Sequence, residues 1–173
     1  MISRRTFITA GLAGGAALAA AYWWRQSSSL TSQAQSPVLD ARASAIIAVI
    51  VPVMLDGALP AQEPQRSASV ADAVAGVRQA IDGLPPAAQH ELAQLFALLA
   101  FAPARMALAR VSSPWPQASA EDVGAFLDRW RQSRFELFRS AYDALHQLVF
   151  AAWYGQPAAW PAIGYAGPPR LTP

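Results

Sequence analysis

The sequence predicts an all-α protein: a small bundle of about five helices behind an N-terminal apolar helix, ending in an irregular tail of proline, glycine and aromatic residues. Two observations predict this fold class. From Leu39 to Trp153 the apolar residues recur with the 3.6-residue period of an α-helix, and no segment shows the two-residue alternation that builds a sheet. Apolar residues also make up 54% of the 173 residues and charged residues only 14%, which is enough for a packed core.

Residues 1–24 have the pattern of an export signal or a membrane anchor. Ser3-Arg4-Arg5-Thr6-Phe7 places two arginines before a large apolar residue, which is the twin-arginine pattern. The apolar run Ile8–Trp24 follows, and it contains small-residue sites for cleavage. At 17 residues this run also reaches the short edge of the roughly 17–25 residues that span a bilayer. We therefore expect export to the periplasm by the twin-arginine translocase, with the signal either cleaved or kept as an inner-membrane anchor through residues 8–24. The signal residues are Arg4, Arg5 and Phe7.

Residues 25–37 are rich in serine and glutamine and have no periodicity, which indicates a flexible linker to a helical domain over 38–173. The domain opens with a strongly apolar segment, Leu39–Leu55, in which Pro52 should kink or end a helix. A strand is the competing interpretation of this segment, because it is rich in β-branched residues. Gly57–Ser67 is expected to be a loop.

Two helices and a shorter helical piece are expected in the middle of the domain. Ser69 is placed to cap the first helix, with Asp72 three residues on, and Pro85-Pro86 separates it from the second. The shorter piece follows Pro103. The apolar residues at helical spacing are Val70, Val74, Val77, Ile81 and Leu84 in the first helix, and Leu92, Leu95, Phe96 and Leu99 in the second.

A loop rich in proline and tryptophan, Ser112–Gln117, leads to the last two helices. Ser119 is placed to cap the first of them, with Asp122 three residues on. The last helix is expected to end by Gly155-Gln156-Pro157. The apolar stripes of these helices are Val123, Phe126, Leu127 and Trp130, then Phe138, Tyr142, Leu145, Val149 and Trp153.

The composition excludes several kinds of chemistry. Cysteine is absent, so the chain has no disulfide, no thiolate nucleophile, and no cysteine-ligated haem or iron–sulfur cluster. The formal charge of +2 falls to −1 when Arg4, Arg5 and Arg25 are set aside, since 10 arginines then face 11 acidic residues. A near-neutral domain without a basic stripe gives no support to nucleic-acid binding.

No residue pattern indicates an active site. The histidines, His90 and His146, have no ligand-spaced companions, so each is expected to be an ordinary helix histidine. Glu121-Asp122 stands in a first helical turn, where acidic residues interact favourably with the helix dipole. No nucleotide-binding, hydrolase or metalloprotease motif is present. We expect no catalytic, cofactor-binding or metal-ligating residue, and no enzyme. An arginine cluster interleaved with Asp128, Glu136 and Asp143 predicts a salt-bridged surface rather than an anion site; its members are Arg129, Arg131, Arg134 and Arg139.

The aromatic residues concentrate towards the C-terminus, with eleven of seventeen between Trp115 and Tyr165. The tail from Trp160 to Pro169 is expected to be neither helix nor central strand, because proline removes donors and glycine permits unusual dihedral angles. Two interpretations of the tail stay open. It is either a cap packed over the end of the bundle or a docking segment that presents Trp160 and Tyr165 to a partner.

Three segments resemble one known family. Ser3–Phe7, the helical stretch Phe126–Tyr154 and the tail resemble the small twin-arginine subunits of membrane-associated flavin dehydrogenases, the gluconate 2-dehydrogenase subunit 3 type. The most specific piece is Ile163-Gly164-Tyr165-Ala166-Gly167-Pro168-Pro169, which is close to that family's terminal signature. Val51–Gly57 is only loosely similar to the end of the family's first helix.

The resemblance implies a partner and a role. The partner is a GMC-type FAD oxidoreductase that lacks an export signal of its own; this chain escorts, co-exports and stabilises it as a non-catalytic accessory subunit. FAD belongs to the partner and no cofactor to this chain, and electrons pass on to a cytochrome c subunit. The alternative functions are an independent membrane-anchored periplasmic binding or scaffold module and a small cofactor-free enzyme that uses arginine and histidine. The docking residues implied are Trp160, Ile163, Gly164, Tyr165, Gly167, Pro168 and Pro169.

Overall fold

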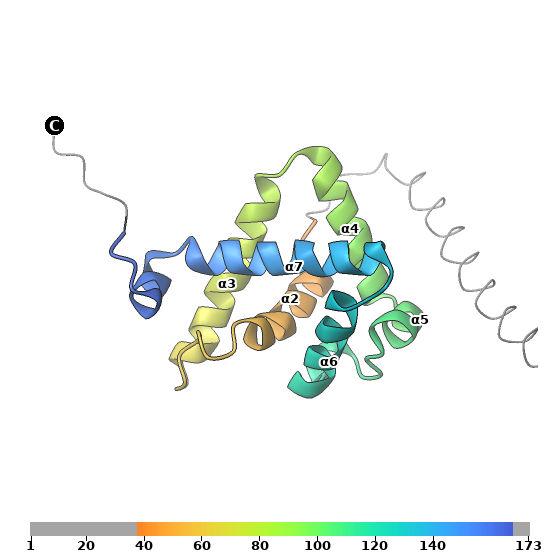
Figure 1. Ribbon diagram of the computed structural model, residues 1–173, viewed down its shortest axis with the longest axis horizontal. Helices are drawn as coiled ribbons and strands as arrows, with labels where there is room; N and C mark the ends of the chain where they lie inside the picture. The colour runs from red at the N-terminus through yellow and green to blue at the C-terminus, as the bar shows by residue number, and fades with distance from the viewer. Residues whose placement is uncertain (1–37, 168–173) are drawn as a thin grey trace, which may run out of the picture. The chain divides into compact units, whose positions relative to one another are not determined.

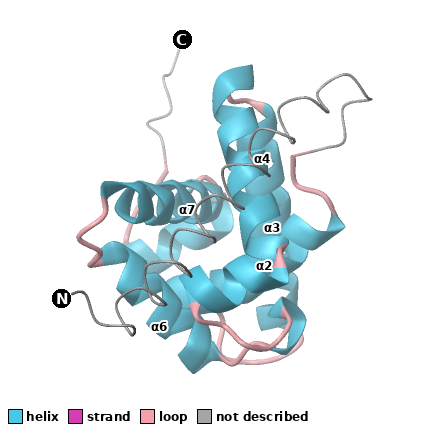
Figure 2. Ribbon diagram, turned by 90° about the vertical axis from the view of Figure 1, so that its right-hand side faces the viewer, coloured by secondary structure: helices cyan, strands magenta, loops and turns pink. Residues whose placement is uncertain are grey.

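The computed structural model describes residues 38–167, which are mostly helical and contain no strand (Figure 1). The prediction of an all-α bundle is confirmed. Figure 2, turned by a right angle, shows the same helices joined by loops. The long helices are α2 (Ala41–Met54), α3 (Gln65–Asp82), α4 (Pro86–Ala100), α6 (Ala120–Arg131) and α7 (Glu136–Tyr154). The short ones are α5 (Ala102–Ala104), a π-helix (Arg105–Ala109) and two 3₁₀ helices (Trp115–Gln117 and Pro157–Ile163).

Within the described residues, no helix by itself has both the length and the apolar composition that crossing a bilayer needs. Helix α4 meets that requirement only together with Ala102–Ala109, and the two parts are bent by 80° at their junction.

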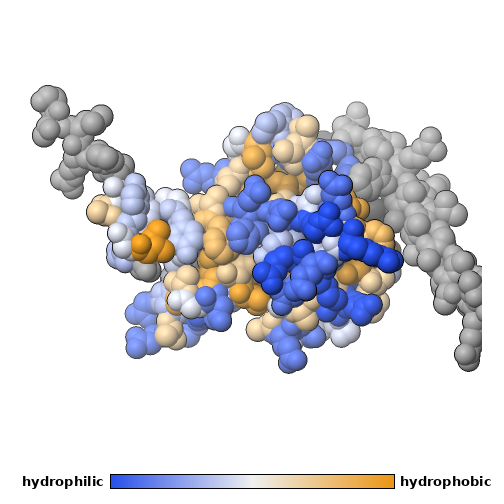
Figure 3. All heavy atoms as spheres, in the orientation of Figure 1, coloured by the Kyte–Doolittle hydropathy of each residue, from blue (hydrophilic) through white to orange (hydrophobic). Residues whose placement is uncertain are grey.

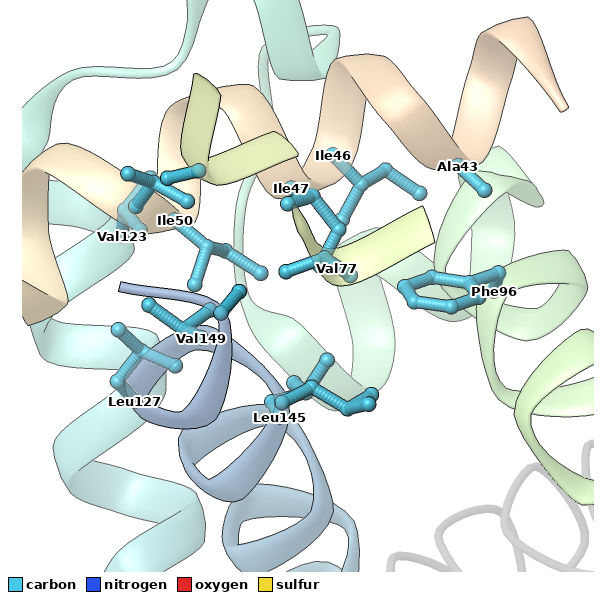
Figure 4. Packing of buried hydrophobic residues seen from close by; sticks show 14 of the residues in the cluster. Ala43, Ile46, Ile47, Ile50, Val77, Phe96, Val123, Leu127, Leu145 and Val149 are labelled. Atoms are coloured by element: carbon cyan, nitrogen blue, oxygen red, sulfur yellow. The ribbon is translucent and has the colours of Figure 1, made fainter. Parts of the chain in front are cut away.

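Helix α2 is the central helix and packs against α3, α4, α6 and α7. Figure 4 shows Ile47 of α2 beside Val77 of α3, and Ile50 of α2 beside Val149 of α7. The strand alternative for Leu39–Leu55 is wrong. Neighbouring helices cover several sides of α2, so a helix that is apolar on more than one side is buried there. The free energy gained by this burial outweighs the small loss of helix propensity that β-branched residues cause.

The ends of α2 follow from its sequence. The backbone N–H of Ala43 donates to the Asp40 carboxylate at 2.8 Å, so Asp40 caps the first turn. Pro52 lies inside the helix, which continues for only two more residues. Proline has no N–H to donate to the carbonyl of the preceding turn, so it weakens the helix at this point. The predicted helix end near Pro52 is confirmed within one turn.

Helices α3 and α7 approach closely at Gly76. A Cβ atom at this position would lie 3.0 Å from the Cβ of Ala152 and 3.2 Å from its carbonyl oxygen. Helix α3 is also tied to α2, since Arg78 donates to the carbonyl of Leu39 at 2.6 Å and to the hydroxyl of Ser44 at 3.0 Å. A glycine in mid-helix is therefore used here for close packing.

The cap predicted at Ser69 is wrong, and the predicted loop Gly57–Ser67 ends earlier than expected. Helix α3 begins at Gln65, so Ser69 lies inside it. The first turn is stabilised instead by Glu63, whose carboxylate accepts from the backbone N–H of Ser67 at 3.1 Å. An acid at the start of a helix satisfies an otherwise unpaired N–H in the same way as a capping serine.

The chain between α4 and α6 is held by side chains that bond to main-chain carbonyls. Pro86 opens α4 as predicted, and the helical piece expected after Pro103 starts at Ala102 and widens into the π-helix. Arg105 is buried, and its guanidinium donates to the carbonyls of Val111 at 3.2 Å and Ser112 at 3.3 Å. This charged side chain thus satisfies the irregular backbone that follows the π-helix.

Two indole groups connect α4, the π-helix and α6. Trp115 donates from Nε1 to the carbonyl of Leu99 at 2.8 Å, and Trp130 donates to the carbonyl of Leu108 at 3.2 Å. The ring of Phe126 meets Trp115 and Trp130 edge-on, at centroid distances of 5.7 and 4.7 Å. Such pairs are the favoured arrangement of buried aromatic rings.

The last helices match the prediction, and the tail departs from it in part. Ser119 caps α6 by accepting from the N–H of Asp122 at 3.0 Å, and α7 ends before Gly155.

The expectation that the tail is not helical is wrong for its first part, because Pro157–Ile163 is a 3₁₀ helix. Pro157 occupies the first position, where its missing N–H costs nothing, and short 3₁₀ turns tolerate a broken hydrogen-bond ladder.

Candidate functional site

The C-terminal tail is the site that the sequence predicts, and Trp160 holds it against the bundle. Its indole Nε1 donates to the carbonyl of Tyr154, in the last turn of α7, at 2.9 Å. The backbone N–H of Tyr165 donates back to the carbonyl of Trp160 at 3.0 Å, and the two rings meet edge-on at 5.2 Å. The tail is therefore folded onto the end of α7 up to Tyr165.

Two glycines let the tail turn. Gly164 has φ of 70° and Gly167 has φ of 94°, values that side-chain-bearing residues rarely adopt. A Cβ atom at Gly167 would also lie 3.0 Å from Cζ3 of Trp160. Gly167 thus packs directly on the indole, and these glycines of the proposed docking signature shape the tail around Trp160.

The predicted docking residues divide into two groups. Trp160 is half-buried, while Ile163 is 54% exposed and Tyr165 is 48% exposed. Trp160 therefore has the position of a cap, and the exposed apolar surface of the tail comes from Ile163 and Tyr165. The packing of Trp160 on α7 agrees with the cap interpretation, and docking to a partner stays a prediction.

Several predicted residues lie outside the described part of the chain. Of the export signal, these are Arg4, Arg5 and Phe7, together with the apolar run Ile8–Trp24 and the linker over 25–37. Of the docking residues, they are Pro168 and Pro169.

The histidines lie in different surroundings. His90 is exposed on α4, and its Nε2 lies 2.7 Å from Nε2 of Gln94, one turn on. His146 is half-buried on α7, where its ring stacks on Phe150 at 4.1 Å. Among residues 38–167, no three acidic or histidine side chains come together in a way that could hold a metal ion.

The arginine cluster is not the salt-bridged surface that the sequence predicts. Residues 38–167 contain one ion pair, between Arg131 and Asp128 at 3.1 Å. Arg129 donates instead to the carbonyl of Ala109 at 2.5 Å, and Arg139 donates to the carbonyl of Ser133 at 2.6 Å. The carboxylates have the sequence spacing that ion pairs with these arginines need. The guanidinium groups of Arg129 and Arg139 donate to main-chain carbonyls instead, because these carbonyls need hydrogen-bond donors.

A second exposed apolar surface was missed by the sequence analysis. It comes from the junction of α4 with α5, the π-helix and the turn before α7. These segments interrupt the regular α-helices, so the 3.6-residue period does not identify which of their side chains are buried. We call this surface the apolar end, and its members are Phe101, Met106, Leu108, Phe135 and Leu137.

Comparison of the chain with protein families, with curated proteins and with solved structures finds no match.

Proposed function

We propose that this chain is a non-catalytic accessory subunit that escorts, co-exports and stabilises a GMC-type FAD-dependent sugar or alcohol dehydrogenase. The observation that supports the proposal is the tail, in which Ile163 and Tyr165 stay exposed while Trp160 fixes their backbone. An exposed apolar segment held in one conformation loses little entropy when a partner covers it. An exposed aromatic side chain and an exposed aliphatic side chain are also suitable anchors for a protein interface.

The twin-arginine pattern at Arg4 and Arg5 gives the second support. This export route moves proteins that are already folded. A chain without a cofactor motif has a reason to use that route when it travels bound to a partner that must fold around FAD first. The tail binds that partner, and the N-terminal signal directs the export of the accessory subunit and the partner together.

The experiment compares tagged full-length chains in the native host. The double variant Ile163→Ser with Tyr165→Ala removes the exposed anchors and leaves Trp160 in place. We expect it to reach the periplasm without the flavoprotein, so that flavin absorbance in the purified complex and dehydrogenase activity in the periplasm both fall. Loss of an anchor of this kind costs roughly 2–4 kcal/mol of binding, which is at least about 30-fold in affinity.

The matched control is Leu137→Ser, which removes an exposed apolar side chain far along α7 from the tail. This variant should retain the flavoprotein. An equal loss of bound flavoprotein from both variants would show a general defect in folding or export. Full dehydrogenase activity in the periplasm with the tail variant would refute docking through Ile163 and Tyr165. A wild-type chain that purifies from membranes alone, as a stable monomer, would support the alternative of an independent periplasmic module.

A further inference from the structure

The apolar end exposes five large side chains in one part of the domain. In Figure 1, α5 and the start of α7 lie on the same side of the domain, opposite the C-terminal 3₁₀ helix. With about 200 Å² for one fully exposed large side chain, the five exposed fractions correspond to on the order of 500 Å² of apolar surface. The largest apolar patch on a typical monomer is of this size and is often an interaction surface.

Trp130 joins the segments that build the apolar end. Its indole N–H bonds to the carbonyl of Leu108 at 3.2 Å, and its ring stacks on Phe138 at 5.2 Å. Phe138 in turn meets Phe135 edge-on at 6.0 Å. One buried side chain therefore holds the π-helix and the turn before α7 together. A surface that is already fixed in this way loses little conformational entropy when a partner covers it.

The charges around the apolar end are of both signs and equal in number. Over residues 101–139, four arginines and four acidic residues are exposed. Figure 3 shows the most hydrophilic atoms over α6 and the start of α7, with apolar atoms beside them. A surface without net charge does not favour a partner of one sign, and it suits a partner whose charges are also mixed.

The start of α7 alternates charged and apolar side chains. Arg134, Phe135, Glu136 and Leu137 follow one another, and all four are exposed. The Cζ atom of Arg134 lies 4.8 Å from the centroid of the Phe135 ring. The one ion pair within residues 38–167 lies elsewhere, on α6, so neither Arg134 nor Glu136 has an ion-pair partner in that range. An unpaired cation and an unpaired anion therefore flank an exposed aromatic residue in the sequence.

We propose that the apolar end binds a second copy of this chain around a twofold axis beside Phe135. A twofold axis brings the same segment of the two copies together in opposite directions. Arg134 of one copy then lies opposite Glu136 of the other, and the same pair forms again across the axis. Both pairs join opposite charges, so the surface is complementary to itself.

The size and composition of the apolar end fit a homodimer interface. A standard interface buries about 800 Å² per partner, and homodimer interfaces are about 65% apolar. The roughly 500 Å² of apolar side chains supplies that share, and the charged residues around them supply the rest. Phenylalanine and methionine are also enriched in interfaces. The tail lies at the other end of α7, so this dimer leaves it accessible to a different partner.

Because the chain has no cysteine, one introduced cysteine reports on one position. Ser140→Cys places a thiol three residues after Leu137 on α7, and Ala158→Cys places one in the tail; both positions are exposed. A short bismaleimide cross-linker is added to each purified full-length protein over a range of concentrations. We expect Ser140→Cys to give a covalent dimer on a denaturing gel at concentrations at which Ala158→Cys stays monomeric.

Two charge reversals test the twofold pairing, each combined with Ser140→Cys. Arg134→Glu places acidic side chains opposite each other, and Glu136→Arg places arginines opposite each other. Each reversal turns two symmetry-related contacts from attraction to repulsion, so either variant alone should dimerise roughly tenfold more weakly. Mixing the two variants pairs arginines with acids again and should restore cross-linking between unlike copies, which tags of different mass distinguish. Circular dichroism establishes that each variant is folded.

Four results would overturn the proposal. The first is the absence of a covalent dimer from Ser140→Cys. Equal cross-linking through Ser140→Cys and Ala158→Cys would mean that the copies associate without a preferred surface. Cross-linking that ignores both charge reversals would exclude the twofold pairing. Loss of the dimer in the tail variant Ile163→Ser with Tyr165→Ala would mean that the tail of one copy binds the apolar end of the next, which builds open chains.

The dimer and the proposed function can fail separately. Leu137→Ser should weaken cross-linking through Ser140→Cys and still retain the flavoprotein, because Leu137 lies at the end of α7 away from the tail. A Leu137→Ser chain that dimerises as strongly as the wild type would count against the apolar end as the interface, whatever the tail binds.

Discussion

The indole N–H of Trp160 donates to the carbonyl of Tyr154 at 2.9 Å, and this bond joins the tail to the last turn of α7. Trp160 stands six positions after Tyr154, so the bond closes a small loop that contains Gly155 and Pro157. Ile163 and Tyr165 depend on this loop for their fixed position.

Trp160→Phe is expected to loosen the tail without unfolding the bundle, because phenylalanine keeps a ring beside Gly167 but cannot donate. The loss of one hydrogen bond is worth about 1 kcal/mol, so hydrogen exchange at the amide of Tyr165 should accelerate roughly fivefold. The melting temperature of the domain should change little, since the tail lies at its end. An unchanged exchange rate at Tyr165 would show that ring packing alone holds the tail.

The pair Gly76→Ala and Gly124→Ala tests the close packing of α3 on α7. Both glycines lie in mid-helix, where alanine is favoured by about 1 kcal/mol. At Gly124 the nearest atom to an added Cβ is Cγ1 of Val53 at 3.7 Å, so this variant should be more stable than the wild type. At Gly76 the added Cβ meets the main chain of Ala152, so the free energy of unfolding should fall by about 1 kcal/mol. Denaturant unfolding measures the free energy of unfolding of each variant. Equal stabilisation of the two variants would mean that α7 moves away from α3 without any loss of packing energy.

Trp115→Phe and Trp153→Phe should differ in stability although both indoles are buried, at 4% and 6% exposure. Trp115 donates to the carbonyl of Leu99, whereas Nε1 of Trp153 has no acceptor among residues 38–167. Removing a satisfied buried donor costs about 1 kcal/mol beyond lost packing, while removing an unsatisfied one recovers its desolvation penalty. We expect Trp115→Phe to be the less stable variant by at least about 1 kcal/mol in denaturant unfolding. The reverse order would imply an acceptor for Trp153 elsewhere in the chain.

Glu63 should titrate below its ordinary value. The hydroxyl of Ser67 donates to its carboxylate, with a further bond from the backbone N–H of Ser67, and these lower the pKa of Glu63 from the usual 4.5. Because the folded pKa is depressed, the stabilising contribution is present above pH 4.5 and is lost as the pH falls through the folded pKa. Ser67→Ala should bring the pKa back towards its ordinary value, as an NMR titration of the carboxyl group measures. An unchanged pKa in Ser67→Ala would assign the shift to the backbone N–H of residue 67, which alanine keeps, and to the weaker attraction of Arg66.

Local signals predicted the helices well, and tertiary contacts explain where the prediction failed. Pro85-Pro86 and Ser119 act within one turn of the chain, so their effects can be read from sequence. Whether Leu39–Leu55 becomes helix or strand depends on neighbours distant in sequence, and α2 is a helix because other helices surround it. The start of α3 was misplaced because Glu63, an acid that is not among the usual capping residues, stabilises its first turn.

The tail shows the same division. Its glycines and prolines predict an unusual backbone, and Gly164 and Gly167 do have positive φ. That Trp160 faces inward while Tyr165 stays exposed depends on the carbonyl of Tyr154, which no sequence pattern identifies. The apolar end was missed because Phe135 and Leu137 flank a helix start, where periodicity is not yet defined.

Helix α7 is one unbroken rod of 19 residues, about 28 Å long. Ile163 and Tyr165 lie beyond one end of it, and Phe135 and Leu137 lie at the other. This separation exceeds the Debye length of about 8 Å at physiological ionic strength, so a charged ligand at one end does not change the potential at the other. Direct electrostatic coupling between the two ends is therefore screened, and any coupling free energy would have to pass through the packing of α7 against α3 and α6. The rod also sets a minimum spacing, because two bodies held at its opposite ends would be kept about 28 Å apart.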